Sequence, residues 1–229
     1  MQQKDDDRAF AVGSVSRRGL LGLGAATAAT MMLPSSLPAM SQRVEQDRRA
    51  KIASVARGQL AVRPKLFAAA LDALGRHHGV IARHDRIAIA DFSLASARPR
   101  LHIVNLEDGR TKSLLVAHGS GSDPDHTGWL ERFSNDFDSN ASSRGAFATS
   151  GYYSGKHGHS QRLIGLDPSN NNAFDRAIVI HGAWYANSDM LVKHGKLGRS
   201  QGCFAVSEAA LEPLFDHLGK GRLLFASKA

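Results

Sequence analysis

The strongest constraint on the fold is a set of alternating segments, two of them joined by a tight turn, in the middle of the chain. Residues 86–92 (RIAIADF) and 100–106 (RLHIVNL) carry apolar side chains with the spacing of β-strands. Asp108-Gly109 then precedes residues 111–116 (TKSLLV), and an Asp-Gly pair between two such runs is typical of a β-hairpin. This part of the chain is therefore predicted to form antiparallel sheet.

Further short strands are predicted later in the chain, with helices only near its ends. Strand-like runs occupy residues 147–149, 162–166, 176–180 and 222–226. Pro64 suits the first turn of a helix that continues to Gly75, and Ser207 suits the N-cap of another that ends at Gly219. Residues 119–146 are rich in Gly, Ser, Asp and Asn, and so long a loop inside a domain is usually functional or mobile. The predicted class is mostly β with peripheral helices (α+β).

The first 41 residues carry the features of an export signal, so they are excluded from the fold argument. Arg17-Arg18 precedes an apolar stretch at residues 20–33, which is too short to span a bilayer. Residues 39–41 (AMS) fit a small-x-small cleavage site. The arginine pair favours a twin-arginine signal peptide over an ordinary secretory signal, and either one predicts a periplasmic protein.

The charge of the chain narrows the choice of partners without identifying one. The formal net charge is +8, and the leader, with four basic and three acidic residues, accounts for only +1 of it. A basic exported protein is suited to an acidic polymer, such as a carboxylate-bearing cell wall, or to an anionic membrane surface. The compartment and the scattered basic residues argue against nucleic acid. No segment after the leader is apolar for long enough to predict a transmembrane anchor.

Cys203 is the only cysteine, so within an exported chain a free reactive thiol or an intermolecular bond is expected. A thiol attacks a carbonyl group as the thiolate and needs a base nearby. His181 ends an apolar run and is followed by Gly182, which lets other backbone approach closely. The glycine-containing run before Cys203 suits a tight loop whose N–H groups face an oxyanion. The alternative is a buried cysteine that packs as a small apolar residue beside Phe204 and Val206.

Several ordered motifs resemble those of the L,D-transpeptidase catalytic domain (the YkuD type), in a divergent branch of that family. They are AHGSGS at 117–122, FSN at 133–135, GKHGHS at 155–160, AIVIHGA at 177–183 and GRSQGC at 198–203. The resemblance spans roughly residues 85–206. It implies a β-rich, sandwich-like catalytic fold and a peptidoglycan substrate.

The resemblance also implies roles for individual residues. Cys203 would attack the amide after the third residue of a stem tetrapeptide, expelling D-alanine and forming a thioester, while His181 would take the thiol proton. The N–H groups of Gly202 and Cys203 would stabilise the oxyanion, Ser200 stands where the family has a serine, and the Gly182 carbonyl would orient the imidazole. An amine of a neighbouring stem would give a 3-3 crosslink, whereas an amine of a lipoprotein or outer-membrane protein would give protein attachment.

Five further residues are candidates for substrate contacts: His118, His157, Trp184, Tyr185 and Arg199. The plainer interpretations are that the histidines are solvated loop residues and that the two aromatic residues cover a sheet edge. One departure from the family pattern affects substrate specificity. Many members carry an arginine two residues after the cysteine, where this chain has Ala205, and the sequence does not rank Arg144, Arg162 and Arg199 as substitutes.

The predicted organisation is a twin-arginine-type signal peptide at 1–41, a helical N-terminal segment at 42–84 and an L,D-transpeptidase-like catalytic domain at 85–229. No cofactor is expected. A metal held by His118 and the His157-x-His159 pair is the weaker alternative, because no HExxH motif or cysteine cluster accompanies them. The expected function is an exported cysteine L,D-transpeptidase acting on peptidoglycan stem peptides. The alternatives are hydrolysis by the same thiol, as a carboxypeptidase or endopeptidase, and an inactive wall-binding module.

Overall fold

The computed structural model describes residues 62–228, so the predicted signal peptide and the first part of the helical segment lie outside the described residues. The strands are β1 (Arg86–Asp91), β2 (Leu101–Asn105), β3 (Thr111–Leu114), β4 (Gly145–Gly155), β5 (Gly158–Gly165), β6 (Val179–Gly182), β7 (Phe204–Val206) and β8 (Leu223–Ser227). The helices are α2 (Pro64–Arg76), α3 (Asp189–His194) and α4 (Glu208–Leu218), with 3-10 turns η1 (Ser120–Ser122) and η2 (Trp184–Ala186).

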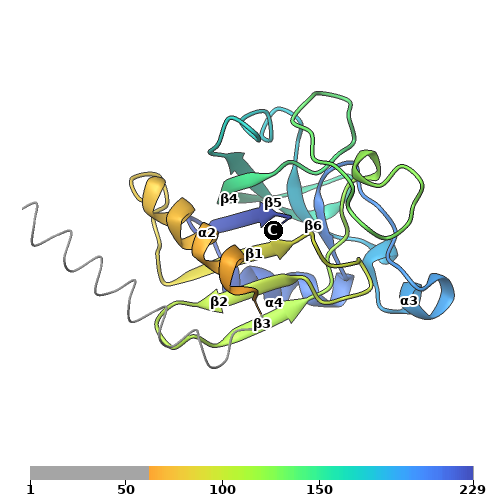
Figure 1. Ribbon diagram of the computed structural model, residues 1–229, viewed down its shortest axis with the longest axis horizontal. Helices are drawn as coiled ribbons and strands as arrows, with labels where there is room; N and C mark the ends of the chain where they lie inside the picture. Colours follow the sequence, from red (N-terminus) through yellow and green to blue (C-terminus); the bar gives the residue numbers. More distant parts are fainter. Residues whose placement is uncertain (1–61, 229) are drawn as a thin grey trace, which may run out of the picture.

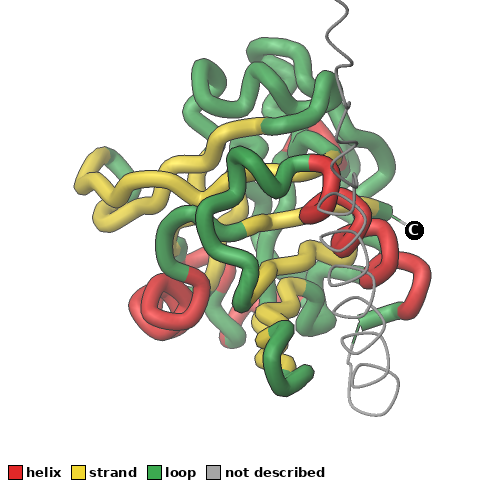
Figure 2. The backbone as a smooth tube through the Cα atoms, turned by 90° about the vertical axis from the view of Figure 1, so that its left-hand side faces the viewer, coloured by secondary structure: helices red, strands yellow, loops and turns green. Residues whose placement is uncertain are grey.

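Within the described residues, eight strands form one mixed sheet in the order β3-β2-β1-β8-β4-β5-β6-β7 (Figure 1). The sheet consists of two meanders, β1–β3 and β4–β6, and the C-terminal strand β8 joins them by pairing with β1 and β4. Strand β7 adds to the outer edge, parallel to β6. Figure 2 shows the helices at the periphery of this sheet and long loops between the strands. The predicted class, mostly β with peripheral helices, is confirmed.

Two differences from the predicted strands concern the segment between Gly145 and Gly182. Strand β4 runs to Gly155 and forms a long hairpin with β5, interrupted by a register shift between Thr149 and Tyr152. Its second half is partly exposed and rich in Gly, Ser and Tyr, so it lacks the apolar alternation that marks a half-buried strand. In addition, β6 begins only at Val179, because the residues just before it form a turn.

Alternate residues of the central strands enter two apolar cores. In β1, Ile87 and Ile89 pack in the core beneath α2, while Ala88 and Ala90 pack in the core beneath α4. The first core is closed by the amphipathic face of α2, which begins with Pro64 as predicted and lies across the sheet (Figure 1). Helix α2 is therefore packed onto the sheet.

The sheet curls so strongly that its two ends meet. Phe92, just after β1, stacks on Phe204 of β7 with ring centroids 6.0 Å apart. Five strand spacings of a flat sheet would separate β1 from β7 by roughly 24 Å. Moreover, Ala117, in the chain leaving β3, donates its N–H to the carbonyl of Ala205 in β7 at 2.8 Å. This closure gives the sheet its sandwich-like core and brings the loop after residue 117 against the segment around Cys203.

Helix α4 begins where predicted but is capped differently. Ser207 occupies the N-cap position, yet its side chain makes no capping hydrogen bond. Instead the side-chain oxygen of Asn187 accepts the N–H of Glu208 at 3.1 Å. The helix start is thus tied to the segment after η2, which follows the His181-Gly182 pair.

Candidate active site

Cys203 and His181 stand on neighbouring strands at one edge of the curled sheet. His181 lies in β6, opposite Ala205 of the parallel strand β7, and Cys203 immediately precedes β7. Ile180, just before His181 on β6, pairs with Phe204, which directly follows Cys203. The two residues that the sequence pairs as nucleophile and base therefore share one strand junction, which the β6–β7 register fixes.

His181 is held as a neutral base with a defined tautomer. Its Nδ1 lies 2.9 Å from the Gly182 carbonyl, which can only accept, so Nδ1 carries the proton and Nε2 is the basic nitrogen. Burial lowers the pKa of His181 most; the Gly182 hydrogen bond opposes this, and His157 and the Lys156 cation add smaller lowering effects. The contact predicted for the Gly182 carbonyl is present, and it leaves Nε2 ready to accept a proton.

The tip of the β4–β5 hairpin reaches over this base. The ring of His157 stacks on that of His181 with centroids 4.4 Å apart and an interplanar angle of 23°. Burial, followed by the charge of Lys156, lowers the pKa of His157, which favours the neutral ring. Of the histidines predicted to contact substrate, His157 is thus placed beside the catalytic candidates, on an exposed turn. Lys156 joins it as a cation that the sequence did not single out.

The Cys203 side chain is only 8% exposed and rests as a thiol. Its S–H donates to the carbonyl of Ala177 at 3.6 Å. Burial raises the pKa of Cys203, and the Val179 N–H and the charges of Lys156 and Arg176 oppose that rise. A buried thiol with a raised pKa needs a base to remove its proton at the moment of attack, which is the task a neutral His181 can perform.

Ser200 and Gly202 shape the turn that presents the thiol. The Ser200 hydroxyl donates to the Cys203 carbonyl at 2.7 Å and accepts the Gly202 N–H at 3.2 Å. Gly202 has a φ of +107°, and a Cβ there would stand 2.7 Å from the Ala141 carbonyl oxygen. Because the Gly202 N–H is already bonded to Ser200, this geometry does not offer it to an oxyanion as expected. The Cys203 N–H remains the candidate donor.

His118 takes a different place from the one predicted. It is 1% exposed, its Nδ1 accepts from Arg100 at 2.7 Å, and its Nε2 donates to Asp123 at 3.2 Å. Burial and the neighbouring charge of Arg100 lower the pKa of His118 to about 4. Both ring nitrogens are therefore engaged inside the protein and unavailable to a substrate. Its backbone serves the site instead, since the His118 carbonyl accepts the Ser200 N–H at 2.9 Å.

Arg176 is the cation beside Cys203 that the sequence did not rank. Its guanidinium lies 3.3 Å from the position a Cβ of Gly202 would take. Burial lowers the pKa of Arg176, and negative charge on Cys203 opposes this with a smaller rise. In turn, the Arg176 cation lowers the pKa of Cys203. Of the three proposed substitutes for an arginine at position 205, Arg162 stacks on Tyr153 at 4.2 Å and Arg144 is exposed.

Arg199, Trp184 and Tyr185 flank the site to different degrees. Arg199 donates to the carbonyls of Asp123 and Pro124, so it ties the loop beside η1 to the turn before Cys203. Trp184 is 66% exposed and meets Tyr185 edge to face at 5.8 Å. Burial, with a smaller effect of negative charge at Cys203, raises the pKa of Tyr185 to about 12, so Tyr185 is a neutral phenol.

Residues 62–228 contain neither a cluster of metal-binding side chains nor a helix suited to crossing a membrane. In this part of the chain no group of three or more His, Cys, Asp or Glu side chains is arranged to hold a metal ion. None of its helices has the length and apolar character that crossing a membrane requires.

The chain was compared with known proteins. A family model described as the L,D-transpeptidase catalytic domain matches residues 59–227. No curated protein matches. Among solved structures, an L,D-transpeptidase from Mycobacterium smegmatis is 12% identical, with a TM-score of 0.39, and the match covers 62% of this chain and 58% of that chain.

Two further solved structures give similar values. An L,D-transpeptidase from Mycobacterium tuberculosis H37Rv is 13% identical over 63% of this chain and 58% of that chain, with a TM-score of 0.41. One from Stackebrandtia nassauensis is 15% identical over 64% of this chain and 57% of that chain, with a TM-score of 0.37. The match therefore spans less than two thirds of the length of these structures.

Proposed function

The chain belongs to the L,D-transpeptidase catalytic domain family, and from this premise we propose that it is an exported cysteine acyltransferase acting on stem tetrapeptides of peptidoglycan. The family acts on peptidoglycan peptides. In this proposal Cys203 forms a thioester with the third residue of the stem and passes the acyl group to an amine. The amine belongs to a neighbouring stem, which gives a 3-3 crosslink, or to a lipoprotein or outer-membrane protein.

The observation that carries the proposal is the junction of β6 and β7. Cys203 immediately precedes β7 there, and Ala205 of that strand pairs with His181, whose Nδ1 lies 2.9 Å from the Gly182 carbonyl and whose Nε2 is therefore the basic nitrogen. A thiol whose pKa is raised and an imidazole whose pKa is lowered suit proton transfer coupled to attack better than a standing thiolate does. A cysteine that served only as a small apolar residue would need no such partner.

Acylation then follows in two proton transfers. His181 Nε2 takes the proton of Cys203, and Sγ attacks the carbonyl carbon of the amide between the third and fourth residues. The Cys203 N–H stabilises the oxyanion, while the charges of Arg176 and Lys156 favour the negative charge on sulfur. His181 returns the proton to the departing amine of D-alanine, which leaves the thioester and a neutral imidazole.

Deacylation reverses these roles. The acceptor amine attacks the thioester carbonyl and gives its proton to His181 Nε2, and the new amide forms as Cys203 leaves as thiolate. The imidazolium then returns the proton to sulfur. Water in place of the amine would release a tripeptide, so the same groups support hydrolysis when no amine is bound.

The test is incubation of the purified protein with a disaccharide-tetrapeptide, followed by mass spectrometry. A dimer that lacks one D-alanine is expected, whereas tripeptide as the sole product contradicts transfer. Cys203→Ala and His181→Gln are expected to abolish both products, and His78→Gln, a change at an exposed histidine on a helix end, serves as the matched control. Transfer that survives Cys203→Ala would refute the thioester mechanism.

Export is the second part of the proposal. It rests on the twin-arginine pattern at Arg17-Arg18, which lies outside the described residues and predicts a periplasmic protein. The double change Arg17→Lys/Arg18→Lys should retain the chain in the cytoplasm. Continued export of this variant at the wild-type rate would contradict the twin-arginine route.

A further inference from the structure

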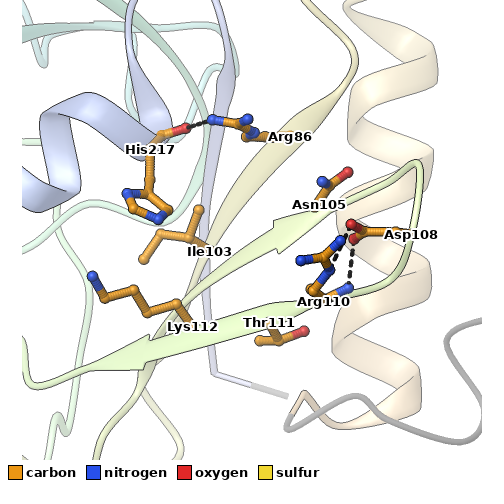
Figure 3. Close-up of a pocket in the computed structure, with 8 residues that line it drawn as sticks. All are labelled: Arg86, Ile103, Asn105, Asp108, Arg110, Thr111, Lys112 and His217. Atoms are coloured by element: carbon orange, nitrogen blue, oxygen red, sulfur yellow. Dashed lines mark hydrogen bonds and ion pairs between the residues drawn. The ribbon is translucent and has the colours of Figure 1, made fainter.

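A groove of about 410 Å³ opens between the end of α4 and the β2–β3 hairpin (Figure 3). Its volume lies in the range of small-ligand sites. Its lining contains none of the residues around Cys203, and it carries three cations, Arg86, Arg110 and Lys112, together with the imidazole of His217. The groove is therefore separate from the thiol site and has its own chemistry.

The register of the sheet explains why these residues gather there. Arg86 pairs with Asn105, and Ile103 pairs with Lys112, so these four side chains share one face of β1–β3. This is the face that carries Ala88 and Ala90 in the core beneath α4. Because α4 ends at Leu218, the sheet face continues past the helix with cationic side chains in place of apolar ones.

The groove carries a net positive charge that its own residues do not neutralise. Its one carboxylate, Asp108, already accepts from the Nε of Arg110 at 2.8 Å and from the Arg110 N–H at 2.9 Å. Arg86 lies 3.8 Å from Asp85, outside the lining, but that carboxylate binds Arg222 more closely at 2.7 Å, and Lys112 faces the groove with no acidic residue of the lining opposite it (Figure 3). An anionic ligand would supply the missing counter-charge.

Part of the groove is held in place before any ligand arrives. Arg86 donates from one terminal nitrogen to the His217 carbonyl at 2.9 Å, which fixes the guanidinium at the end of α4. The His217 Nδ1 donates to the Pro213 carbonyl at 2.8 Å, which leaves Nε2 for other partners. In Figure 3 His217 and Lys112 lie on either side of Ile103, which forms an apolar floor.

We propose that this groove binds a short acidic peptide, namely the carboxylate-bearing stem of a second peptidoglycan strand. Arg86 and Lys112 would bind its carboxylates, the side chains of Asn105 and Thr111 would bind its amide groups, and Ile103 would contact a methyl side chain. The choice of a peptide over a simple anion follows from this combination of cations, amide-binding groups and an apolar floor.

The position of the groove relative to the thiol supports a polymeric ligand. Helix α4 begins beside the active-site pair, since a Cβ of Gly182 would lie 3.4 Å from the Cα of Glu208, and it reaches the groove at His217. The nine residue steps from Glu208 to His217 rise by roughly 14 Å. A wall fragment with two stems can therefore occupy both sites, whereas a single short peptide in the groove leaves the thiol free. This inference rests on the proposed function for the identity of the polymer.

The test measures binding of the protein to isolated peptidoglycan, in a Cys203→Ala background so that no transfer occurs. Arg86→Gln/Lys112→Gln should weaken binding about tenfold at low salt. Lys65→Gln/Arg98→Gln, which removes the same charge from exposed positions outside the groove, should change binding less than twofold. Equal losses in the two double variants would show that only the overall charge acts, and would overturn the proposal.

A single variant and a competition measurement complete the test. Arg86 also bonds to the backbone of α4, so Lys112→Gln alone, at an exposed side chain, repeats the measurement if the double variant fails to fold, and unchanged binding by it would overturn the proposal. Poly-γ-glutamate is expected to displace the protein from peptidoglycan, and displacement by polyphosphate alone would exclude a carboxylate ligand. The binding result is independent of the proposed chemistry, because that chemistry fails separately if transfer survives Cys203→Ala.

Discussion

Replacing Arg176 by methionine is expected to have two separable effects, one on stability and one on the thiol. The guanidinium donates to four groups of the loop at 134–143: Ser134 O at 3.0 Å, Ser143 Oγ at 2.6 Å, Ser139 Oγ at 3.1 Å and Ala141 O at 2.7 Å. Methionine keeps most of the apolar stem and removes every donor together with the charge. The loop that packs against Gly202 would lose the four hydrogen bonds by which Arg176 holds it.

The effect on stability follows from the kind of group left behind. The two serine hydroxyls can rotate toward water or other partners, but the carbonyls of Ser134 and Ala141 lose charged donors. A buried acceptor without a partner costs about 1–3 kcal/mol, and Ala141 is buried whereas Ser134 is half-buried. We therefore expect unfolding to become easier by about 2–3 kcal/mol, a large part of the 5–15 kcal/mol typical of a domain. Urea unfolding measures it.

The effect on the thiol is separated from the effect on stability by a second variant, Arg176→Lys. Arg176→Met removes a positive charge that favours the thiolate, so the pKa of Cys203 should rise and alkylation by iodoacetamide should shift to higher pH. Arg176→Lys keeps the charge but loses the planar fork, so it should lose stability and keep a pH profile close to that of the wild type. An Arg176→Met protein with an unchanged alkylation profile would refute the electrostatic role, and one with unchanged stability would refute the stabilising role of these hydrogen bonds.

Three other changes test particular contacts. Gly202→Ala puts a Cβ 2.7 Å from the Ala141 oxygen and 2.8 Å from Ile178 Cδ1 at a φ of +107°, so unfolding in urea should become easier by about 2–4 kcal/mol, and a loss below 1 kcal/mol would contradict the packing. The pKa of His118 is about 4 when folded and 6.5 at its ordinary value, so the unfolded chain binds this proton first. Stability should therefore be fully present above pH 6.5 and fall by roughly 3 kcal/mol as the pH drops to 4. His118→Gln should flatten that part of the profile, and an equally steep loss in the variant would point to other groups. Trp184→Ala should leave stability within about 0.5 kcal/mol while raising KM for the stem peptide, and an unchanged KM would remove this residue from the substrate site.

The strands could be predicted where their side chains are apolar and buried. The run of residues 86–92 gave a clear signal, because its alternate residues enter two apolar cores. The second half of β4 gave none, because Tyr152 and its neighbours are half-exposed. Helix α3 was also missed, since six residues with Val192 fully on the outside show no apolar face of useful length.

The site was predictable as far as its chemistry lies in short motifs. The cysteine, the histidine and the glycines around them are local in sequence, and the structure brings them to one strand junction. His118 was misjudged because its partners, Arg100 and Asp123, reach it only through the fold. The local sequence of a histidine in a glycine-rich loop is the same whether its side chain faces solvent or a buried arginine. Only the packing of the folded chain distinguishes the two cases.

The fold also explains why this chain has Ala205 where many members of the family have an arginine. Ala205 is fully buried, lies opposite His181 and pairs with Ala117 where the two ends of the sheet meet. In this closed sheet an arginine at position 205 would have to bury its charge beside Ala183 and Leu197. Arg176, in the turn before β6, supplies a cation near Gly202 instead. Its charge favours the thiolate of Cys203, and the contact between the two ends of the sheet stays intact.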